Sequence, residues 1–122
     1  MSNRPFRFLI DEDTAHVIRD GFLRRQPDAE VLVIGGEGAP KIGTNDEEIL
    51  EFLERETYIL VSSNRRTMPE HLHAHLQKGR HIPGILLLRP RSSYRQIIDV
   101  LELIWLAGIP TDFHDRLTHI PF

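Results

Sequence analysis

Apolar residues occur along this chain in two alternating patterns. Short continuous apolar runs, typical of buried β-strands, lie at Phe6–Ile10, Val31–Ile34, Tyr58–Val61 and Gly84–Leu88. Between and after them, apolar residues recur three and four positions apart, which predicts helices over Thr14–Arg25, Asp46–Glu56, Pro69–Lys78 and Tyr94–Ala107. Beyond Pro110, the pattern predicts a short turn of helix and an edge strand from Arg116 to Ile120.

Strands that are apolar on both faces and are separated by helices predict an α/β fold. Such strands need a helix layer on each side, so we expect a three-layer, Rossmann-like arrangement. Its central sheet should be mostly parallel, with four to five strands and helices on both faces. We expect residues 1–122 to form one domain, because the chain shows no internal repeat and no linker.

Parallel strands end at the same edge of a sheet, and ligands bind outside those carboxyl ends. Four segments should therefore lie close together, since each follows a predicted strand: Asp11–Asp13, Gly35–Gly36, Ser62–Asn64 and Arg89–Arg91. The last predicted helix is apolar nearly all round, which favours deep burial or an oligomer contact. We expect Leu101, Ile104 and Trp105 to contribute to a dimer or partner contact.

Composition narrows these expectations only a little. Apolar residues make up 40% of the chain and charged residues 27%, as in ordinary globular proteins. There is no cysteine, which excludes disulfides and thiolate metal sites and favours the cytoplasm. The first residues lack the apolar core of a signal peptide, and the longest apolar runs are too short to span a membrane. A net charge of −3 argues against broad electrostatic coating of nucleic acid, although a local basic rim is compatible with it.

Two acidic residues are candidates for chemistry, and each also has a structural interpretation. Asp11 follows an apolar strand directly, where a carboxylate needs a partner or a cation, but it can equally be a loop acid near a helix start. Asp46 lies in TNDEEIL (44–50), where Thr44 with Glu47, or Asn45 with Glu48, can form a capping box. The residues alone favour a structural role for Asp46.

Other motifs in the sequence are weaker. His71 and His75 are four residues apart on a predicted helix, but no third metal ligand accompanies them, so an exposed polar face is favoured. The segment GGEG (35–38) lacks the spacing of a dinucleotide-binding fingerprint and predicts a flexible loop. Neither Ser62 nor Ser63 lies in a nucleophile elbow.

Four segments, taken in order, resemble a known family. RFLIDED (7–13), TNDEEIL (44–50), ILVSSNRRTMP (59–69) and GRHIPGILLL (79–88) are similar to the PIN-like family DUF5615, which is related to VapC-type toxin and Mut7-C nuclease domains. The resemblance runs from about Arg7 to Leu88. It rests on the order and spacing of the four segments rather than on any single motif.

The resemblance implies a PIN fold whose carboxylates hold Mg²⁺ or Mn²⁺ for hydrolysis of RNA phosphodiesters. Its first two carboxylates match Asp11 and Asp46, and we expect Asp13, Glu12 or Glu47 to assist these two in holding an ion. The third matches Asn64, where the family commonly has an aspartate. An amide oxygen brings no charge, so this departure weakens the expected metal site.

The function implied by this resemblance is that of the toxin component of a bacterial toxin–antitoxin pair. It would be a metal-dependent ribonuclease with a small, helix-turn-helix type antitoxin as partner. Arg65, Arg66, Arg89 and Arg91 are then expected to meet RNA phosphates. One alternative is a catalytically degenerate PIN-like module that binds RNA or a protein. Another is a nucleotide- or phosphate-binding module that uses the Gly35–Gly36 loop.

Overall fold

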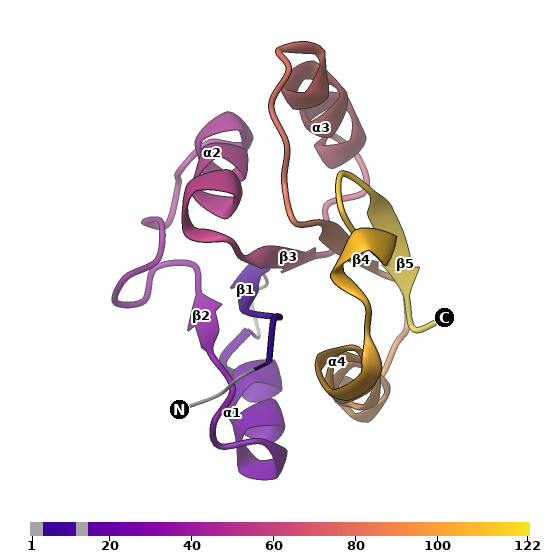
Figure 1. Cartoon of the computed structure of the whole chain (residues 1–122). Coiled ribbons are helices and arrows are strands. Elements are labelled where there is room, and N and C mark those ends of the chain that lie inside the picture. The colour runs from indigo at the N-terminus through magenta and orange to yellow at the C-terminus, as the bar shows by residue number, and fades with distance from the viewer. Residues whose placement is uncertain (1–3, 12–14) are drawn as a thin grey trace.

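The computed structural model describes residues 4–11 and 15–122 (Figure 1). In this part of the chain, helices and strands alternate as the apolar pattern predicts. The elements are β1 (Phe8–Asp11), α1 (Ala15–Arg25), β2 (Val31–Val33), α2 (Asp46–Glu56), β3 (Ile59–Ser62), α3 (Met68–Gln77), β4 (Ile85–Leu88), α4 (Tyr94–Ala107), the 3₁₀ turn η1 (Pro110–Asp112) and β5 (Leu117–Ile120).

The strands form one five-stranded sheet in the order β2-β1-β3-β4-β5. Every neighbouring pair in it is parallel. The predicted α/β class, the parallel sheet and the edge strand in the tail are therefore confirmed. Strand β2 pairs with one side of β1, and β3, which comes later in the chain, pairs with the other side. The strand order thus reverses between β1 and β3, which is where sheets of this kind bind ligands.

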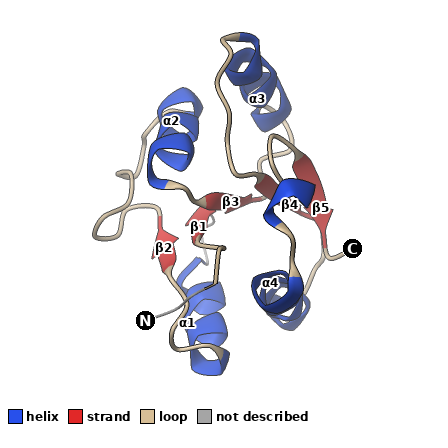
Figure 2. Ribbon diagram, viewed as in Figure 1, coloured by secondary structure: helices blue, strands red, loops and turns tan. Residues whose placement is uncertain are grey.

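Helices α1 and α4 cover one face of the sheet, and α2 and α3 cover the other (Figures 1 and 2). Side chains alternate along each strand, so Phe8 and Ile10 pack into the core under α1 and α4, whereas Leu9 packs into the core under α2 and α3. Both cores consist of fully buried aliphatic and aromatic side chains. This is the three-layer, Rossmann-like arrangement that strands buried on both faces require.

Helix α4 corrects one prediction about the partner contact. Leu101, Ile104 and Trp105 are 1%, 2% and 6% exposed and belong to the core beneath the helix. They cannot form a surface contact in this fold. Leu103 and Leu106 of the same helix, in contrast, remain outside and are 55% and 42% exposed. The helix is apolar nearly all round because one face fills the core while the other keeps leucines at the surface.

No helix in the described ranges is long and apolar enough to cross a membrane.

Candidate functional site

A cleft of about 500 Å³ opens at the carboxyl edge of the sheet, at the reversal point between β1 and β3. We call it the carboxyl-edge cleft. It is lined by residues from four regions of the chain: Asp11, Ala15, His16, Val33, Ile34, Ile42, Gly43, Thr44, Asp46, Ile49, Ser62, Ser63 and Asn64. The cleft therefore brings together three sequence-predicted site residues, Asp11, Asp46 and Asn64.

Asp11 is the last residue of β1, and its position in the sheet follows from strand register. It lies opposite Ser62 of β3 in the parallel ladder, so the ends of these two central strands are level with each other. The side chain is partly exposed and lines the cleft. Asp11 has an interaction partner within the protein. Asp11 therefore lies at the carboxyl end of an apolar strand, as the sequence predicts.

Asp46 is placed by the cap of helix α2. The side chain of Asn45 accepts a hydrogen bond from the Glu48 N–H at 2.9 Å, so Asn45 is the N-cap and Asp46 the first helical residue. Of the two capping pairs that the sequence allows, the structure uses Asn45 with Glu48. Asp46 thus lies in the first turn, where the helix dipole favours a carboxylate. It also faces the carboxyl-edge cleft.

Asn64 connects the turn after β3 to Asp46. The Asn64 N–H donates to the hydroxyl of buried Ser62 at 3.1 Å, which closes the turn at the end of the strand. Its side-chain amide donates to Asp46 Oδ2 at 3.3 Å and to Thr67 Oγ1 at 2.9 Å, while its oxygen accepts from the Thr67 N–H at 3.3 Å. These bonds direct the amide nitrogen toward Asp46 and its oxygen toward the start of α3.

Asp46 Oδ2 receives further contacts from the start of α3. The Thr67 hydroxyl donates to this oxygen at 3.1 Å, and His71 Nε2 lies 3.4 Å from it. Together with the amide of Asn64, these groups surround a single carboxylate oxygen with donors. We refer to Asp46, Asn64, Thr67 and His71 as the Asp46 cluster. Sequence reasoning did not assign Thr67 and His71 to the site, because only the packing of α2 against α3 brings them there.

The pairing of the α3 histidines corrects the expectation of an exposed polar face. His75 is 5% exposed, and its Nε2 lies 3.0 Å from Glu54 Oε1 near the end of α2. His71 is two-thirds buried beside Asp46 at the start of α2. The spacing of four residues therefore places the histidines against two different acids of the neighbouring helix. They do not share a ligand site.

The four predicted phosphate-binding arginines are all exposed, but they differ in what they contact. Arg65 donates to the Leu88 carbonyl at 2.9 Å, and Arg89 donates to the Pro121 carbonyl at 2.8 Å. These two hold the ends of β4 and β5. Within the described ranges, Arg66 and Arg91 make no hydrogen bond or ion pair to the protein. They are the arginines whose guanidinium groups are open to a ligand.

The tail acids and the glycine loop do not extend the site. Asp115 accepts a hydrogen bond from the Ile82 N–H at 2.8 Å, at the opposite, amino-terminal edge of the sheet. The Gly35 and Gly36 N–H groups donate to carbonyls of Pro40 and Val33, both at 2.8 Å. Because these donors are used within the loop, they are not open to a phosphate. The predicted ligands Glu12 and Asp13 lie outside the described residues.

The donor set of the cleft fits one hard cation better than a cluster of ions. Mg²⁺ keeps much of its water and is often held by one or two carboxylates plus substrate phosphate. Asp11 and Asp46, which both line the cleft, are carboxylates of this kind. Within residues 4–11 and 15–122, no group of three or more histidines and acids could hold a metal ion. The oxygen of Asn64, turned toward Thr67, adds no ligand in this conformation.

No family model, curated protein or solved structure matches this chain. Its fold and its cleft are therefore the basis for any functional conclusion.

Proposed function

We propose that this protein is a PIN-like, metal-dependent ribonuclease that acts through the carboxyl-edge cleft. The observation that carries the proposal is the meeting of Asp11, Asp46 and Asn64 at one cleft, at the point where the strand order reverses. These are the residues that the sequence resemblance would make metal ligands, and they come from three separate segments. The toxin role and the antitoxin partner follow from the same resemblance and belong to this proposal.

In the proposed mechanism, the chain's own residues bind and position the RNA. Asp11 and Asp46 Oδ1 would hold a single Mg²⁺ or Mn²⁺. When bound, such an ion supplies an activated water and neutralises charge on the scissile phosphate. Thr67, Asn64 and His71 hold Asp46 in one orientation through its other oxygen. Arg66 and Arg91 would contact neighbouring phosphates of the RNA, and these contacts would fix the register of the RNA strand.

RNA cleavage by the purified protein tests this proposal. Single-stranded RNA would be incubated with Mn²⁺ or Mg²⁺, and with a chelator, for the wild type and for Asp11→Ala. We expect metal-dependent cleavage that falls by about 100-fold or more in the variant. Asp112→Ala, which removes an exposed acid at the opposite edge, is the matched control and should retain activity. Equal cleavage by Asp11→Ala and wild type would show that the activity does not come from this cleft.

A second function, RNA binding without cleavage, is favoured by the orientation of Asn64. Its amide nitrogen donates to Asp46 in the direction where a metal-binding site would need an acceptor. The same assay separates the two functions. A wild type that binds RNA without cutting it, together with an Asn64→Asp variant that cuts, would identify a degenerate PIN-like module. Replacement of Arg66 and Arg91 by alanine should then weaken binding, whereas Arg24→Ala, at an exposed position near the end of α1, should not.

We further propose that the outer face of α4 contacts a partner, either a second copy of the chain or the antitoxin. Leu103 and Leu106 on the helix, together with Ile109 just beyond its end, recur every three residues and are 55%, 42% and 58% exposed. These exposed residues are proposed for the partner contact in place of Leu101, Ile104 and Trp105, which are buried. Light scattering at micromolar concentration should show a dimer that Leu103→Glu with Leu106→Glu disrupts. A monomeric wild type would exclude self-association through this face, and the antitoxin would then be the partner to test.

A further inference from the structure

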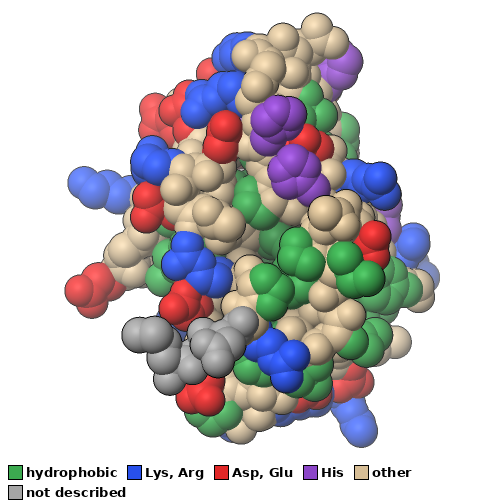
Figure 3. Space-filling view, viewed as in Figure 1, with side chains coloured by type: hydrophobic (Ala, Val, Ile, Leu, Met, Phe, Trp, Pro, Cys, Tyr) green, Lys and Arg blue, Asp and Glu red, His purple; other side chains and the backbone are tan. Residues whose placement is uncertain are grey.

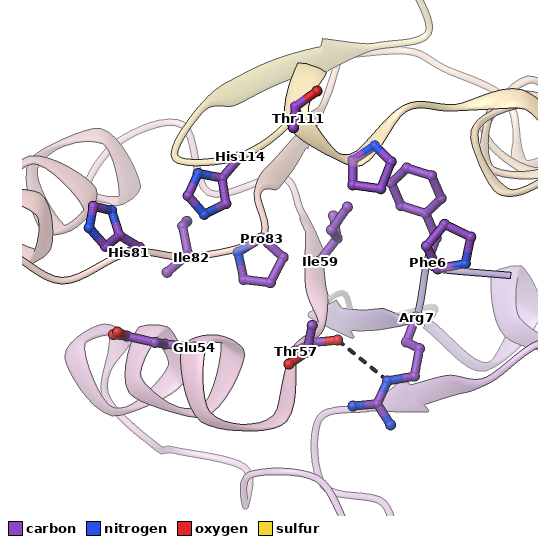
Figure 4. Close-up of a pocket in the computed structure, with 12 residues that line it drawn as sticks. Phe6, Arg7, Glu54, Thr57, Ile59, His81, Ile82, Pro83, Thr111 and His114 are labelled. Atoms are coloured by element: carbon purple, nitrogen blue, oxygen red, sulfur yellow. Dashed lines mark hydrogen bonds between the residues drawn. The ribbon is translucent and has the colours of Figure 1, made fainter.

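A second hollow, of about 490 Å³, lies at the amino-terminal edge of the sheet, opposite the carboxyl-edge cleft (Figure 4). We call it the amino-edge pocket. It lies between the segments that enter β1 and β4, the end of α2, and the turn η1. Its volume is in the range of small-molecule sites. Nothing in the proposed nuclease function uses it.

Much of the wall of the amino-edge pocket is apolar. Phe6, Ile59 and Ile82 are at most 3% exposed, and they form part of the pocket lining. Pro5, Pro83 and Pro110 complete the walls. Proline has no N–H group, so these residues offer the pocket a hydrocarbon surface without a hydrogen-bond donor. Such a lining favours the body of an apolar ligand.

Two histidines form the polar end of the pocket. The His81 and His114 rings stack with their centroids 5.7 Å apart. Both direct Nδ1 to the same oxygen of Asp115, at 2.7 and 3.3 Å. This arrangement assigns the Nδ1 proton on each ring and leaves Nε2 available. In the described part of the chain, neither Nε2 atom has a hydrogen-bond partner. In Figure 4 the two rings lie together at one end of the pocket, away from Arg7.

The acids near these histidines are already compensated. Glu54 lines the pocket but accepts from Arg80 at 3.1 Å and contacts His75 at 3.0 Å. Asp115 is held by the Ile82 N–H and by the two rings. Arg7, at the other end, is bound to Glu30 and to the carbonyl of Thr57. The charged side chains of the pocket are thus paired within the protein, whereas the two imidazoles keep Nε2 atoms that become donors in the protonated, cationic form.

We propose that the amino-edge pocket binds a small aromatic carboxylate, with its ring against Phe6, Ile59 and Ile82 and its carboxylate on Nε2 of His81 and His114. At mildly acidic pH an imidazole becomes an imidazolium, which presents an Nε2–H donor to the ligand. On the face of the molecule shown in Figure 3, histidine side chains lie beside hydrophobic ones. An acid with a flat apolar body is complementary to both parts of the pocket.

Titration with 2-naphthoate tests this proposal. Its binding to the wild-type protein would be measured by ligand-observed NMR and calorimetry, with 2-naphthamide as the uncharged counterpart. We expect saturable binding of the acid, because its carboxylate is a strong acceptor for the Nε2–H donors of protonated His81 and His114. The amide should bind about 10-fold more weakly or not at all.

Two variants locate the binding. Thr111 is exposed at the rim of the pocket, so Thr111→Trp should fill the opening without disturbing the core and should abolish binding. His114→Gln should weaken binding by about 10-fold. His73→Gln changes an exposed histidine on α3 and should have no effect. Melting curves of all three variants would verify that they are folded.

Three results would overturn the proposal. They are the absence of saturable binding to the wild type, equal binding to Thr111→Trp, and equal binding of the acid and the amide. RNA cleavage by Thr111→Trp should equal that of the wild type. The pocket and the nuclease site are thus tested by separate readouts, and failure of one leaves the other standing.

Discussion

Asn64 is the residue at which the sequence departs from the pattern of a metal-binding nuclease. Its amide supplies two donors to the Asp46 cluster, one to Asp46 Oδ2 and one to Thr67. An aspartate at this position would place two carboxylates against each other with no donor between them. Like charges at such a distance disfavour ionisation of both groups unless a cation joins them. The amide therefore holds the cluster together when no metal is bound.

The substitution Asn64→Asp tests whether the amide of Asn64 holds the Asp46 cluster together in the absence of a metal ion. Without divalent metal, we expect the free energy of unfolding to fall by about 1–3 kcal/mol, because a donor pair is lost and a charge repulsion is added. Addition of Mn²⁺ should raise the melting temperature of the variant more than that of the wild type. Urea denaturation with and without Mn²⁺ measures both effects.

Asn45→Asp is the matched control, because aspartate serves as an N-cap as well as asparagine does. It should leave stability nearly unchanged and add no response to Mn²⁺. If Asn64→Asp behaved like Asn45→Asp, the hydrogen bonds of Asn64 to Asp46 and Thr67 would make no contribution to the free energy of unfolding.

At the scale of the elements, the end of α2 contains a strained residue. Thr57 is the C-cap and has φ 62° and ψ 60°, a left-handed conformation that β-branched residues rarely adopt. Its N–H bonds to the Leu53 carbonyl at 2.9 Å, which ends the helix and turns the chain into β3. Glycine adopts this conformation without steric cost.

Replacement of Thr57 by glycine should therefore stabilise the protein. Relief of strain contributes about 1–3 kcal/mol, and the greater freedom of glycine in the unfolded chain takes back up to about 1 kcal/mol. We expect a net gain of about 1 kcal/mol in chemical denaturation. Thr111→Gly, at an exposed position without a positive φ, should instead lose stability. A loss with Thr57→Gly would mean that the threonine side chain makes a stabilising contact that outweighs the strain.

Strand β5 is fastened to the sheet edge through Asp115. Burial alone would raise the pKa of this carboxyl group, but the Ile82 N–H and the His81 ring bind its charged form and lower the pKa below its ordinary value. A carboxylate whose pKa is lowered by folding stabilises the native state above the unfolded-state pKa of about 4. That contribution is lost as the pH falls through the lower, folded-state pKa. Glu54 has a lowered pKa as well, for similar reasons.

Asp115→Asn tests this contribution, and asparagine also tolerates the positive φ of 61° at this position. The variant should be less stable than the wild type at about pH 7, and the difference should shrink as the pH falls through the lowered, folded-state pKa of Asp115. Urea denaturation at several pH values measures the difference. Asp112→Asn, which removes a carboxyl group from an exposed turn, is the matched control. A constant difference for Asp115→Asn would indicate that its charge is not involved.

For the whole molecule, the fold could be predicted from sequence more fully than the site. Short apolar strands alternating with helices imply a covered parallel sheet, and this holds even for the tail strand Leu117–Ile120. The meeting of Asp11 and Ser62 at one edge follows from parallel register alone. These features depend on periodicity and chain direction, which a single sequence contains.

The parts that sequence reasoning missed depend on which helix faces meet. Thr67 and His71 reach Asp46 only because α3 packs against α2, and no spacing along the chain encodes that contact. The same applies to Leu101, Ile104 and Trp105, whose helix is apolar on both sides, so that periodicity does not distinguish the core face from the outer face. Contacts between elements distant in sequence require the tertiary structure.

Paramagnetic broadening by Mn²⁺ detects a divalent-ion site at the carboxyl-edge cleft without relying on enzymatic activity. Amide signals in an NMR spectrum of the assigned protein would be recorded during titration with Mn²⁺. We predict that the signals of Ser62, Ser63, Asn64 and the Gly43–Asp46 segment broaden first, and that Asp11→Ala abolishes the effect. Broadening elsewhere on the protein, or broadening at the cleft that persists in Asp11→Ala, would show that Asp11 does not hold a divalent ion at this cleft.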